Sequence, residues 1–215
     1  MNSKTSKSLN LNCEDIKIHL SKTKMPSNPC EYLIDLNKAH SPQRTKQKLN
    51  LSLKPAGVLL PIIKRKENLY LLFTHRSKEL THHANQVSFP GGKMDFCDKD
   101  IRATALRETK EEVDISPDEI SVVGYLDTIL TTTGYAVTPI VGLVEPFIQT
   151  KVNNEVDYIF EVPISYFLDK RNDIFRKILW KQQNIHSIEF KWNKERIWGV
   201  TAIIIILLRD KLLKQ

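Results

Sequence analysis

The amino-acid sequence predicts one α/β domain built on a mixed β-sheet. Apolar runs of strand length and helix length follow one another without regular strand–helix–strand alternation, which argues against an all-parallel sheet. All seven glycines lie between Gly57 and Gly199, and this distribution marks where a folded core begins. Of the 215 residues, 41% are hydrophobic and 27% are charged, the ordinary balance of a globular protein with a buried core.

Residues 1–53 are predicted to form a basic, polar N-terminal segment, partly disordered or with a short helix. Residues 1–54 carry ten Lys or Arg and four Asp or Glu, which gives +6 of the net charge of +7. Apolar side chains between Leu9 and Leu20 predict one short amphipathic element, and Pro26, Pro29 and Pro42 interrupt the chain beyond it. Such a segment is usually a solvated arm, although it is also suited to contact nucleic acid or anionic lipid.

A β-hairpin opens the predicted domain, residues 54–215. Gly57–Ile63 and Leu69–His75 are apolar runs of strand length, and the turn-like sequence 64–68 separates them. Residues 76–97 are predicted to be mostly loop, with an extended stretch at 86–89. The run from Lys99 to Val113 predicts a helix.

The second half of the domain is predicted to extend the sheet and to close with a helix. Predicted strands cover 121–130, 137–144, 158–162 and 188–192, and predicted helices cover 164–168 and 198–214. The longest apolar stretch, Val200–Leu208, has nine residues, whereas a membrane-spanning helix needs about 20. We therefore expect a buried closing helix and no membrane partner.

The cysteines indicate the compartment. Cys13, Cys30 and Cys97 are widely spaced, and no Cys-x-x-Cys pair occurs. This pattern favours neither a disulfide framework nor a cysteine zinc site. It fits the reducing cytosol, so a cytoplasmic location is predicted.

Three glutamates gather on one face of the helix predicted at 99–113. Glu108, Glu111 and Glu112 stand at i, i+3 and i+4, within about 100° of arc. Carboxylates this close repel one another unless a cation lies among them, and a divalent ion such as Mg²⁺ prefers oxygen ligands. Arg107 lies beside the acids and can orient one of them by a bidentate pair.

The loop before this helix argues against a merely solvated acidic helix end, which the triplet alone would favour. The sequence Phe89-Pro90-Gly91-Gly92 leads toward the helix. Paired glycines allow a tight turn and a close approach of the backbone to a ligand. Loop and acids together predict a binding site.

These residues resemble the Nudix box, Gly-x5-Glu-x7-Arg-Glu-U-x-Glu-Glu-x-Gly-U, in which U is aliphatic. Gly92 matches its first glycine, and Arg107-Glu108 with Glu111-Glu112 match its centre. The resemblance implies a Nudix-type α/β/α sandwich with a mixed β-sheet.

Three positions depart from the box. The spacing from Gly92 to the arginine is one residue longer than usual, with Asp98 at the sixth place. Thr109 replaces an aliphatic residue, and Asp114 replaces the last glycine. Aspartate tolerates the left-handed conformation better than most residues, so the end of the helix is expected to survive.

The flanking residues narrow the resemblance to the coenzyme A pyrophosphatase branch of the Nudix hydrolases. Residues 72–77 (LFTHRS) and 86–92 (QVSFPGG) look like its signature, and this branch also tolerates the longer box. Thr81 stands where the signature has a second arginine, and Asn85 where it has a glycine. Because Asn85 can adopt positive φ, we expect the loop shape to persist. The likeness covers residues 54–208.

The resemblance implies metal-dependent hydrolysis of coenzyme A or its acyl derivatives to 3′,5′-ADP and (acyl-)4′-phosphopantetheine. Mg²⁺ or Mn²⁺ is the expected cofactor, because a divalent metal neutralises the phosphates and lowers the pKa of a bound water. The expected site residues are Glu108, Glu111, Glu112 and Arg107 for catalysis, the same three glutamates with Glu155 for the metal, and Arg76, Ser77, Phe89, Gly91 and Gly92 for substrate. Which glutamate acts as the general base stays open, and Arg76 is equally suited to a surface ion pair.

Two other functions stay open. The replacements Thr81 and Asn85 suit a Nudix pyrophosphatase that acts on another nucleoside diphosphate-linked substrate, such as a dinucleotide or a sugar nucleotide. The basic N-terminal segment suits a non-catalytic RNA-binding module. Against this function, a protein without catalytic activity has no reason to keep three mutually repelling glutamates together. We therefore expect a small nucleotide substrate, no nucleic-acid partner, and a monomer or homodimer.

Overall fold

The computed structural model describes residues 11–33, 53–81, 83–146, 152–180 and 183–214. Its helices are α1 (Cys13–Leu20), α4 (Ile101–Val113), α5 (Ile164–Leu168) and α6 (Gly199–Leu213), with 3₁₀ turns η1 (Pro117–Glu119) and η2 (Lys170–Asn172). Its strands are β1 (Lys54–Arg65), β2 (Asn68–Arg76), β3 (Val87–Ser88), β4 (Gly91–Lys93), β5 (Ile120–Tyr125), β6 (Ile129–Leu130), β7 (Tyr135–Val144), β8 (Val156–Pro163), β9 (Ile174–Trp180), β10 (Gln183–Trp192) and β11 (Glu195–Trp198).

The main sheet has eight strands and is mixed. Its central order is β3-β2-β1-β7-β5, with β4 paired to β1, β6 to β7 and β8 to β2. Strands β1 and β7 run parallel along ten residue pairs, whereas β1 pairs antiparallel with β2 and β4. This topology confirms the mixed sheet and the hairpin predicted at 57–75.

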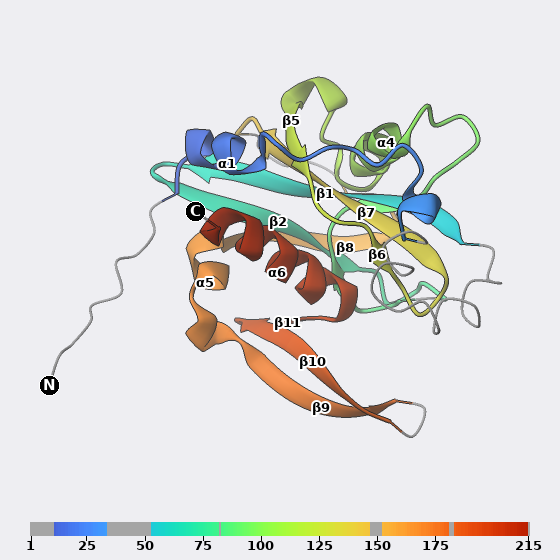
Figure 1. Cartoon of the computed structure of the whole chain (residues 1–215), viewed down its shortest axis with the longest axis vertical. Helices are drawn as coiled ribbons and strands as arrows, with labels where there is room; N and C mark the ends of the chain where they lie inside the picture. The colour runs from blue at the N-terminus through green and yellow to red at the C-terminus, as the bar shows by residue number, and fades with distance from the viewer. Residues whose placement is uncertain (1–10, 34–52, 82, 147–151, 181–182, 215) are drawn as a thin grey trace, which may run out of the picture.

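The helices cover both faces of this sheet because the side chains of β1 alternate between them (Figure 1). Leu59 and Ile63 pack in one buried cluster with Ala105 of α4. Leu60 and Ile62 belong to the other cluster, which includes the buried residues of α1, α5 and α6. The predicted α/β/α arrangement is confirmed, and the acidic helix is anchored to the most central strand.

Part of the N-terminal segment packs on the domain. Asn12 caps α1 by accepting hydrogen bonds from the next turn, and Asp15 accepts in return from the Asn12 amide. Ile16 and Leu20 of α1 are buried against the sheet. The predicted amphipathic element is therefore α1, although its expected start at Leu9 lies outside the described residues. The boundary at residue 53 stays a prediction.

The predicted strand at 121–130 is wrong, because it is divided into β5 and β6. The Leu126 amide donates to the Pro139 carbonyl, and the Thr128 and Thr138 hydroxyls bond at 2.9 Å, so residues 126–128 leave the regular ladder. Pairing with β7 also shifts register within β5. Sequence periodicity does not reveal a bulge of this kind.

The second, three-stranded sheet is only partly anticipated by the sequence. The strand expected at 188–192 is the end of the longer β10, which pairs with β9 and β11. Figure 1 shows the β9–β10 hairpin projecting away from the main sheet. Phe175 of β9 is 71% exposed, so this side chain does not contribute to the core.

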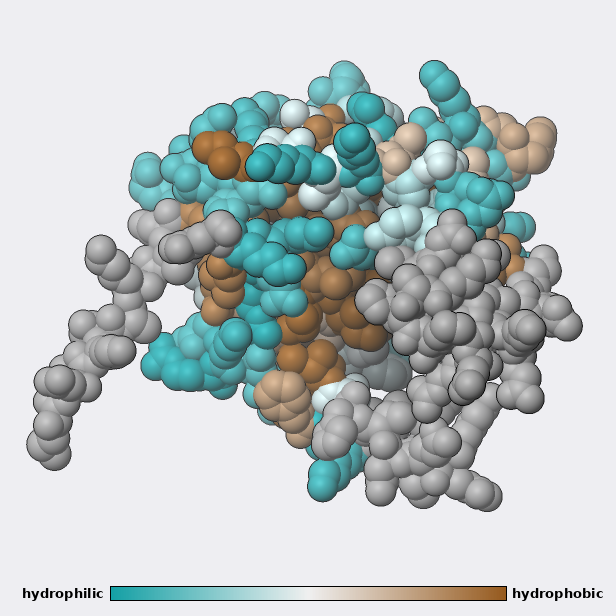
Figure 2. Space-filling view, in the orientation of Figure 1, coloured by the Kyte–Doolittle hydropathy of each residue, from teal (hydrophilic) through white to brown (hydrophobic). Residues whose placement is uncertain are grey.

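Helix α6 closes the domain, as predicted. Ile205 and Leu208 are buried, and Arg209 makes a bidentate ion pair with Asp173 at 2.6 and 2.9 Å. On this side of the molecule, Figure 2 shows apolar surface at the centre with polar residues around it. Within the part of the chain that the structure describes, no helix is long and apolar enough to cross a membrane.

Candidate active site

Helix α4 places the predicted acids. It begins after Asp100, whose carboxylate accepts a hydrogen bond from the Ala103 amide at 2.8 Å. It ends at Asp114, which adopts φ +57° in the left-handed region, as expected for the residue that replaces the last glycine of the box. Thr109, the other departure in the helix, is buried and donates its hydroxyl to the Ala105 carbonyl at 2.7 Å. Both replacements are thus accommodated.

The paired glycines bring the backbone against the acids. A Cβ atom at Gly92 would overlap the carboxylate of Glu108, and one at Gly91 would overlap the backbone of β1. The Gly91 amide donates to Glu112 Oε2 at 3.3 Å. The glycines are therefore needed because Glu108 and Glu112 lie directly against β4.

Arg107 holds two of the glutamates and one aspartate. Its Nη1 lies 2.9 Å from Glu108 Oε1 and 3.1 Å from Glu111 Oε2. The bidentate pair expected with a box glutamate is formed instead with Asp98, at 2.9 Å for both bonds. These hydrogen bonds lower the pKa of Asp98 to about 2. In the sequence Asp98 stands out only as a departure from the box, and its role as the anchor of Arg107 was not predicted.

Arg76 comes from the end of β2 and faces the same site. Its Nη1 lies 3.6 Å from Glu112 Oε1, and its Nη2 lies 3.6 Å from Glu155 Oε2. Glu155 belongs to the loop before β8, which is fixed at two points. The Ser77 amide donates to the Glu155 carbonyl at 2.8 Å, and the Asn153 amide donates to the Glu112 carbonyl at 3.2 Å.

Burial dominates the electrostatics of the site. Glu112 is 3% exposed, and desolvation raises the pKa of its carboxyl to about 8. Arg76 and the Gly91 amide oppose this shift, whereas Glu108 and Glu155 add to it. Burial also raises the pKa of Glu108. A cation would offset this desolvation by favouring the ionised carboxylates, and their oxygen donors are of the type that a divalent cation prefers.

The glutamates are not arranged as a closed metal cage. In the described ranges, no three His, Cys, Asp or Glu side chains are grouped so that they could hold an ion. Glu108 and Glu111 face Arg107, and Glu112 and Glu155 face Arg76. The structure therefore brings the four predicted ligands to one region, and their direct metal ligation stays a prediction.

Two residues predicted to bind substrate have buried side chains. Phe89 is 3% exposed and stacks on Phe73 with ring centroids 4.7 Å apart, so its ring belongs to the core. Ser77 is 5% exposed, and its hydroxyl accepts a hydrogen bond from the Glu79 amide at 3.3 Å. Both residues shape the loop that carries the site, and a direct contact of either side chain with substrate is not supported. Nearby Asn85 adopts φ +58°, as expected for a replacement of glycine.

The comparisons with known proteins agree with this geometry. The NUDIX domain family matches residues 53–175. The Nudix hydrolase NudL of Photorhabdus laumondii is 46% identical over 152 residues, which cover 70% of this chain and 80% of that protein. NudL of Escherichia coli O139:H28 is 36% identical over 181 residues, 81% of this chain and 90% of the relative.

Solved structures support the same fold. A MutT/nudix family protein from Enterococcus faecalis superposes with a TM-score of 0.50 over 88% of this chain and 76% of its own, at 14% identity. At such low sequence identity, the superposition supports the fold alone. Together with the family match, the acidic helix α4 and the glycine pair of β4, these findings show that the chain belongs to the Nudix family and is a pyrophosphohydrolase.

Proposed function

We propose that this Nudix hydrolase cleaves the pyrophosphate bond of coenzyme A or its acyl derivatives, releasing 3′,5′-ADP and (acyl-)4′-phosphopantetheine. One observation carries the proposal. Both parts of the segment that resembles the coenzyme A signature contact the acidic helix, since Arg76 lies 3.6 Å from Glu112 and the Gly91 amide donates to the same carboxylate. A guanidinium at this position can pair with a phosphate oxygen of a bound substrate.

Three groups of residues would have separate roles in the reaction. Glu108, Glu111, Glu112 and Glu155 would hold Mg²⁺ or Mn²⁺, which neutralises phosphate charge and lowers the pKa of a bound water. Arg107 keeps Glu108 and Glu111 in place through hydrogen bonds that Asp98 anchors. The Gly91–Gly92 backbone lines the site without side chains that would keep a phosphate away.

The proton of the attacking water needs a carboxylate close to the metal. Glu108 and Glu112 are the more buried of the box glutamates, and burial raises the pKa of both. A base with a raised pKa accepts a proton more readily near neutral pH. These two residues are therefore the candidates for the general base, and Glu111, at 54% side-chain exposure, is better suited to the metal alone.

Mass spectrometry of the products tests the substrate. Coenzyme A incubated with the full chain and Mg²⁺ should yield 3′,5′-ADP and 4′-phosphopantetheine, and EDTA or Glu112→Gln should abolish both. Arg102→Gln is a matched control, because Arg102 is exposed on α4. Absence of both products with Mg²⁺ and with Mn²⁺ would overturn the coenzyme A assignment.

A second candidate substrate is another nucleoside diphosphate derivative. Thr81, which is exposed, replaces the second arginine of the signature and so removes one cation that a phosphate could meet. Rates with NADH and diadenosine polyphosphates, measured beside coenzyme A, separate the candidates, since equal rates exclude coenzyme A specificity. We also propose a cytoplasmic enzyme, because Cys13, Cys30 and Cys97 are all free thiols.

A further inference from the structure

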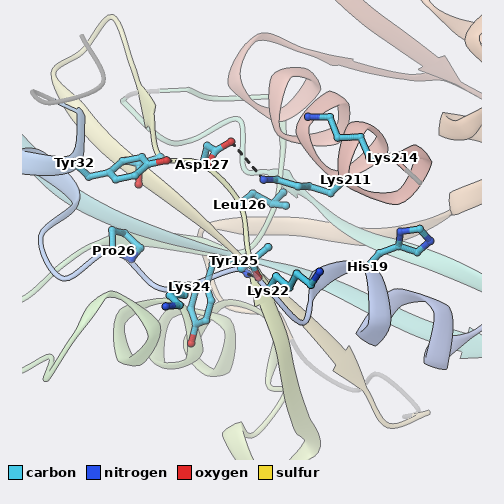
Figure 3. A pocket seen from close by; sticks show the side chains of 12 residues that line it. His19, Lys22, Lys24, Pro26, Tyr32, Tyr125, Leu126, Asp127, Lys211 and Lys214 are labelled. Atoms are coloured by element: carbon cyan, nitrogen blue, oxygen red, sulfur yellow. Dashed lines mark hydrogen bonds and ion pairs between the residues drawn. The ribbon is translucent and has the colours of Figure 1, made fainter. Parts of the chain in front are cut away.

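A cavity of about 410 Å³ lies beside the edge strand β5, and none of its described lining residues belongs to the acidic helix α4 (Figure 3). Its walls come from α1, the segment after α1, the β5–β6 connection and the C-terminal end of α6. None of the predicted catalytic, metal or substrate residues lines it. Its lining residues at 19–32 and 211–214 also fall outside the matched NUDIX domain at 53–175. We call it the basic cavity.

The basic cavity has an excess of positive charge. Lys22, Lys24, Lys211 and Lys214 line it, and among the described residues Asp127 is its one acidic lining residue. Asp127 is already engaged, because the Tyr32 hydroxyl donates to it at 2.9 Å and Lys211 Nζ lies 3.9 Å away.

The remaining lysines of the basic cavity differ from Lys211 in their contacts. Lys22, Lys24 and Lys214 have no carboxylate partner within the ranges that the structure describes. Several ammonium groups around one cavity produce a positive potential that attracts a multiply charged anion. A phosphorylated ligand has that character.

The basic cavity has ring-bearing side chains at one end and lysines at more than one place. In Figure 3, Pro26 and Tyr32 lie at one end, and Lys211 and Lys214 lie at the other. Lys24 lies beside Pro26 in the same view. A ligand with a flat ring and a phosphate tail would match both ends, and a volume near 410 Å³ is within the usual range for small-molecule sites.

The walls of the basic cavity are tied to the domain. The hydrogen bond from Tyr32 to Asp127 joins the N-terminal segment to the β5–β6 connection. Thr23 Oγ1 accepts from the Tyr125 amide at 2.9 Å, which fixes the segment after α1 to the end of β5. The cavity is therefore preformed, so ligand binding carries little cost for ordering its walls.

From these features we propose that the basic cavity is a second ligand site, which binds a nucleoside diphosphate with its base toward Pro26 and Tyr32 and its phosphates toward Lys22, Lys211 and Lys214. The proposal does not depend on which substrate the acidic site hydrolyses. It assigns to the N-terminal segment the role of building a binding site on the hydrolase domain.

Calorimetric titration of the full chain with ADP in EDTA tests the proposal. We expect one ADP per chain, and affinity at least about tenfold weaker in the double variant Lys22→Glu/Lys214→Glu, since two attractive contacts become repulsive. The control is the double variant Lys64→Glu/Lys170→Glu, which changes the net charge by the same amount at exposed sites outside the cavity. Its affinity for ADP should stay within about twofold of the wild type. Tyr32→Leu should weaken ADP several-fold but leave pyrophosphate binding unchanged.

Any one of four results would overturn the proposal. The first is that ADP fails to bind, and the second is that both double variants lose affinity equally. The third is that ADP binding is lost with Arg76→Met and retained with Lys22→Glu/Lys214→Glu, which would place ADP in the acidic site. The fourth is that single-stranded RNA binds through the same lysines and ADP does not, which would indicate a nucleic-acid site instead. Thermal unfolding of every variant ensures that lost binding does not reflect lost structure.

Discussion

Arg76 Nη1 lies 3.6 Å from Oε1 of the buried Glu112, and this ion pair joins the end of β2 to the acidic helix. The same guanidinium reaches Glu155, while its Nε is buried without a hydrogen-bond partner in the described part of the chain. At 3.6 Å both contacts are ion pairs rather than close hydrogen bonds. Arg76 is therefore a counter-ion between two carboxylates and can exchange them for other partners.

Replacing Arg76 by Met should change how the protein responds to metal. Without the guanidinium, Glu112 and Glu155 lose their counter-charge, so we expect the metal-free protein at pH 8.5 to be destabilised by about 1–3 kcal/mol. Added Mn²⁺ should raise the melting temperature more in the variant than in the wild type, because no guanidinium competes for the carboxylates. Thermal unfolding with and without MnCl₂ measures both effects.

The matched control for Arg76 is Arg102→Met, which removes an exposed arginine from α4. Its Mn²⁺ response should equal that of the wild type. An Arg76 variant that responds to Mn²⁺ no more than this control would contradict the counter-ion role.

The buried carboxyl of Glu112 should make the stability of the metal-free protein depend on pH. Its pKa rises from 4.5 to about 8 on folding, so the folded state binds the extra proton. The stability that the protonated form provides is complete below pH 4.5 and is lost as the pH rises through about 8. Glu112→Gln has no such loss, and its stability relative to wild type should increase by about 2–4 kcal/mol between pH 5 and pH 8.5.

Urea unfolding in EDTA at several pH values measures the Glu112 effect. Glu111→Gln is the control, since its side chain is 54% exposed and an exposed carboxylate carries little desolvation cost. A Glu112→Gln curve that runs parallel to wild type from pH 5 to 8.5 would show that this carboxyl is not buried as described.

Gly92→Ala should damage activity through Glu108. The new Cβ would overlap the Glu108 carboxylate, which must then move. Since displacements of about 1 Å at a catalytic group can cost about 100-fold in rate, we expect kcat/KM to fall by that order while the fold is retained. Steady-state kinetics and circular dichroism provide the two readouts.

Gly134→Ala is the comparison for Gly92→Ala. No atom lies within 4 Å of a Cβ there, although φ is +85°, so this change should lower stability and leave kcat/KM near wild type. Equal losses of activity in the two variants would indicate general strain rather than displacement of Glu108.

Arg107→Lys should lower kcat more than it raises KM. One ammonium group cannot reproduce the bidentate bond to Asp98 together with the contacts to Glu108 and Glu111. The glutamates would lose their orientation while Arg76 is untouched. A variant with unchanged kcat would refute the positioning role, and Arg102→Lys controls for the general effect of the exchange.

Local sequence patterns were enough to predict much of the fold. The hairpin formed by β1 and β2, helix α4, helix α5 and helix α6 were expected within a few residues, because each buries a regular apolar face. Strand β9 was not predicted, because it depends on its pairing with β10 and on contacts such as the ion pair of Arg176 with Glu189. The division of 121–130 into β5 and β6 likewise depends on contacts with β7.

The part of the candidate site that depends on residue spacing along the chain was predictable. Glu108 and Glu112 share a helix face in any regular helix, and the glycine pair precedes them in the chain. The burial of Phe89 was not predictable, because it depends on Phe73 of a neighbouring strand. The anchoring of Arg107 by Asp98 depends on how the loop before α4 folds back on the helix.

The sequence by itself determined the family, the acidic helix and the residues available for chemistry, because these depend on spacing along one chain. Only the tertiary structure decided which charges face one another. Arg76 meets Glu112 across the contact between a strand and a helix, and the basic cavity unites lysines from opposite ends of the chain. The physical reason is that burial and the distances between charges, which set pKa and ligand preference, arise from packing between segments far apart in sequence.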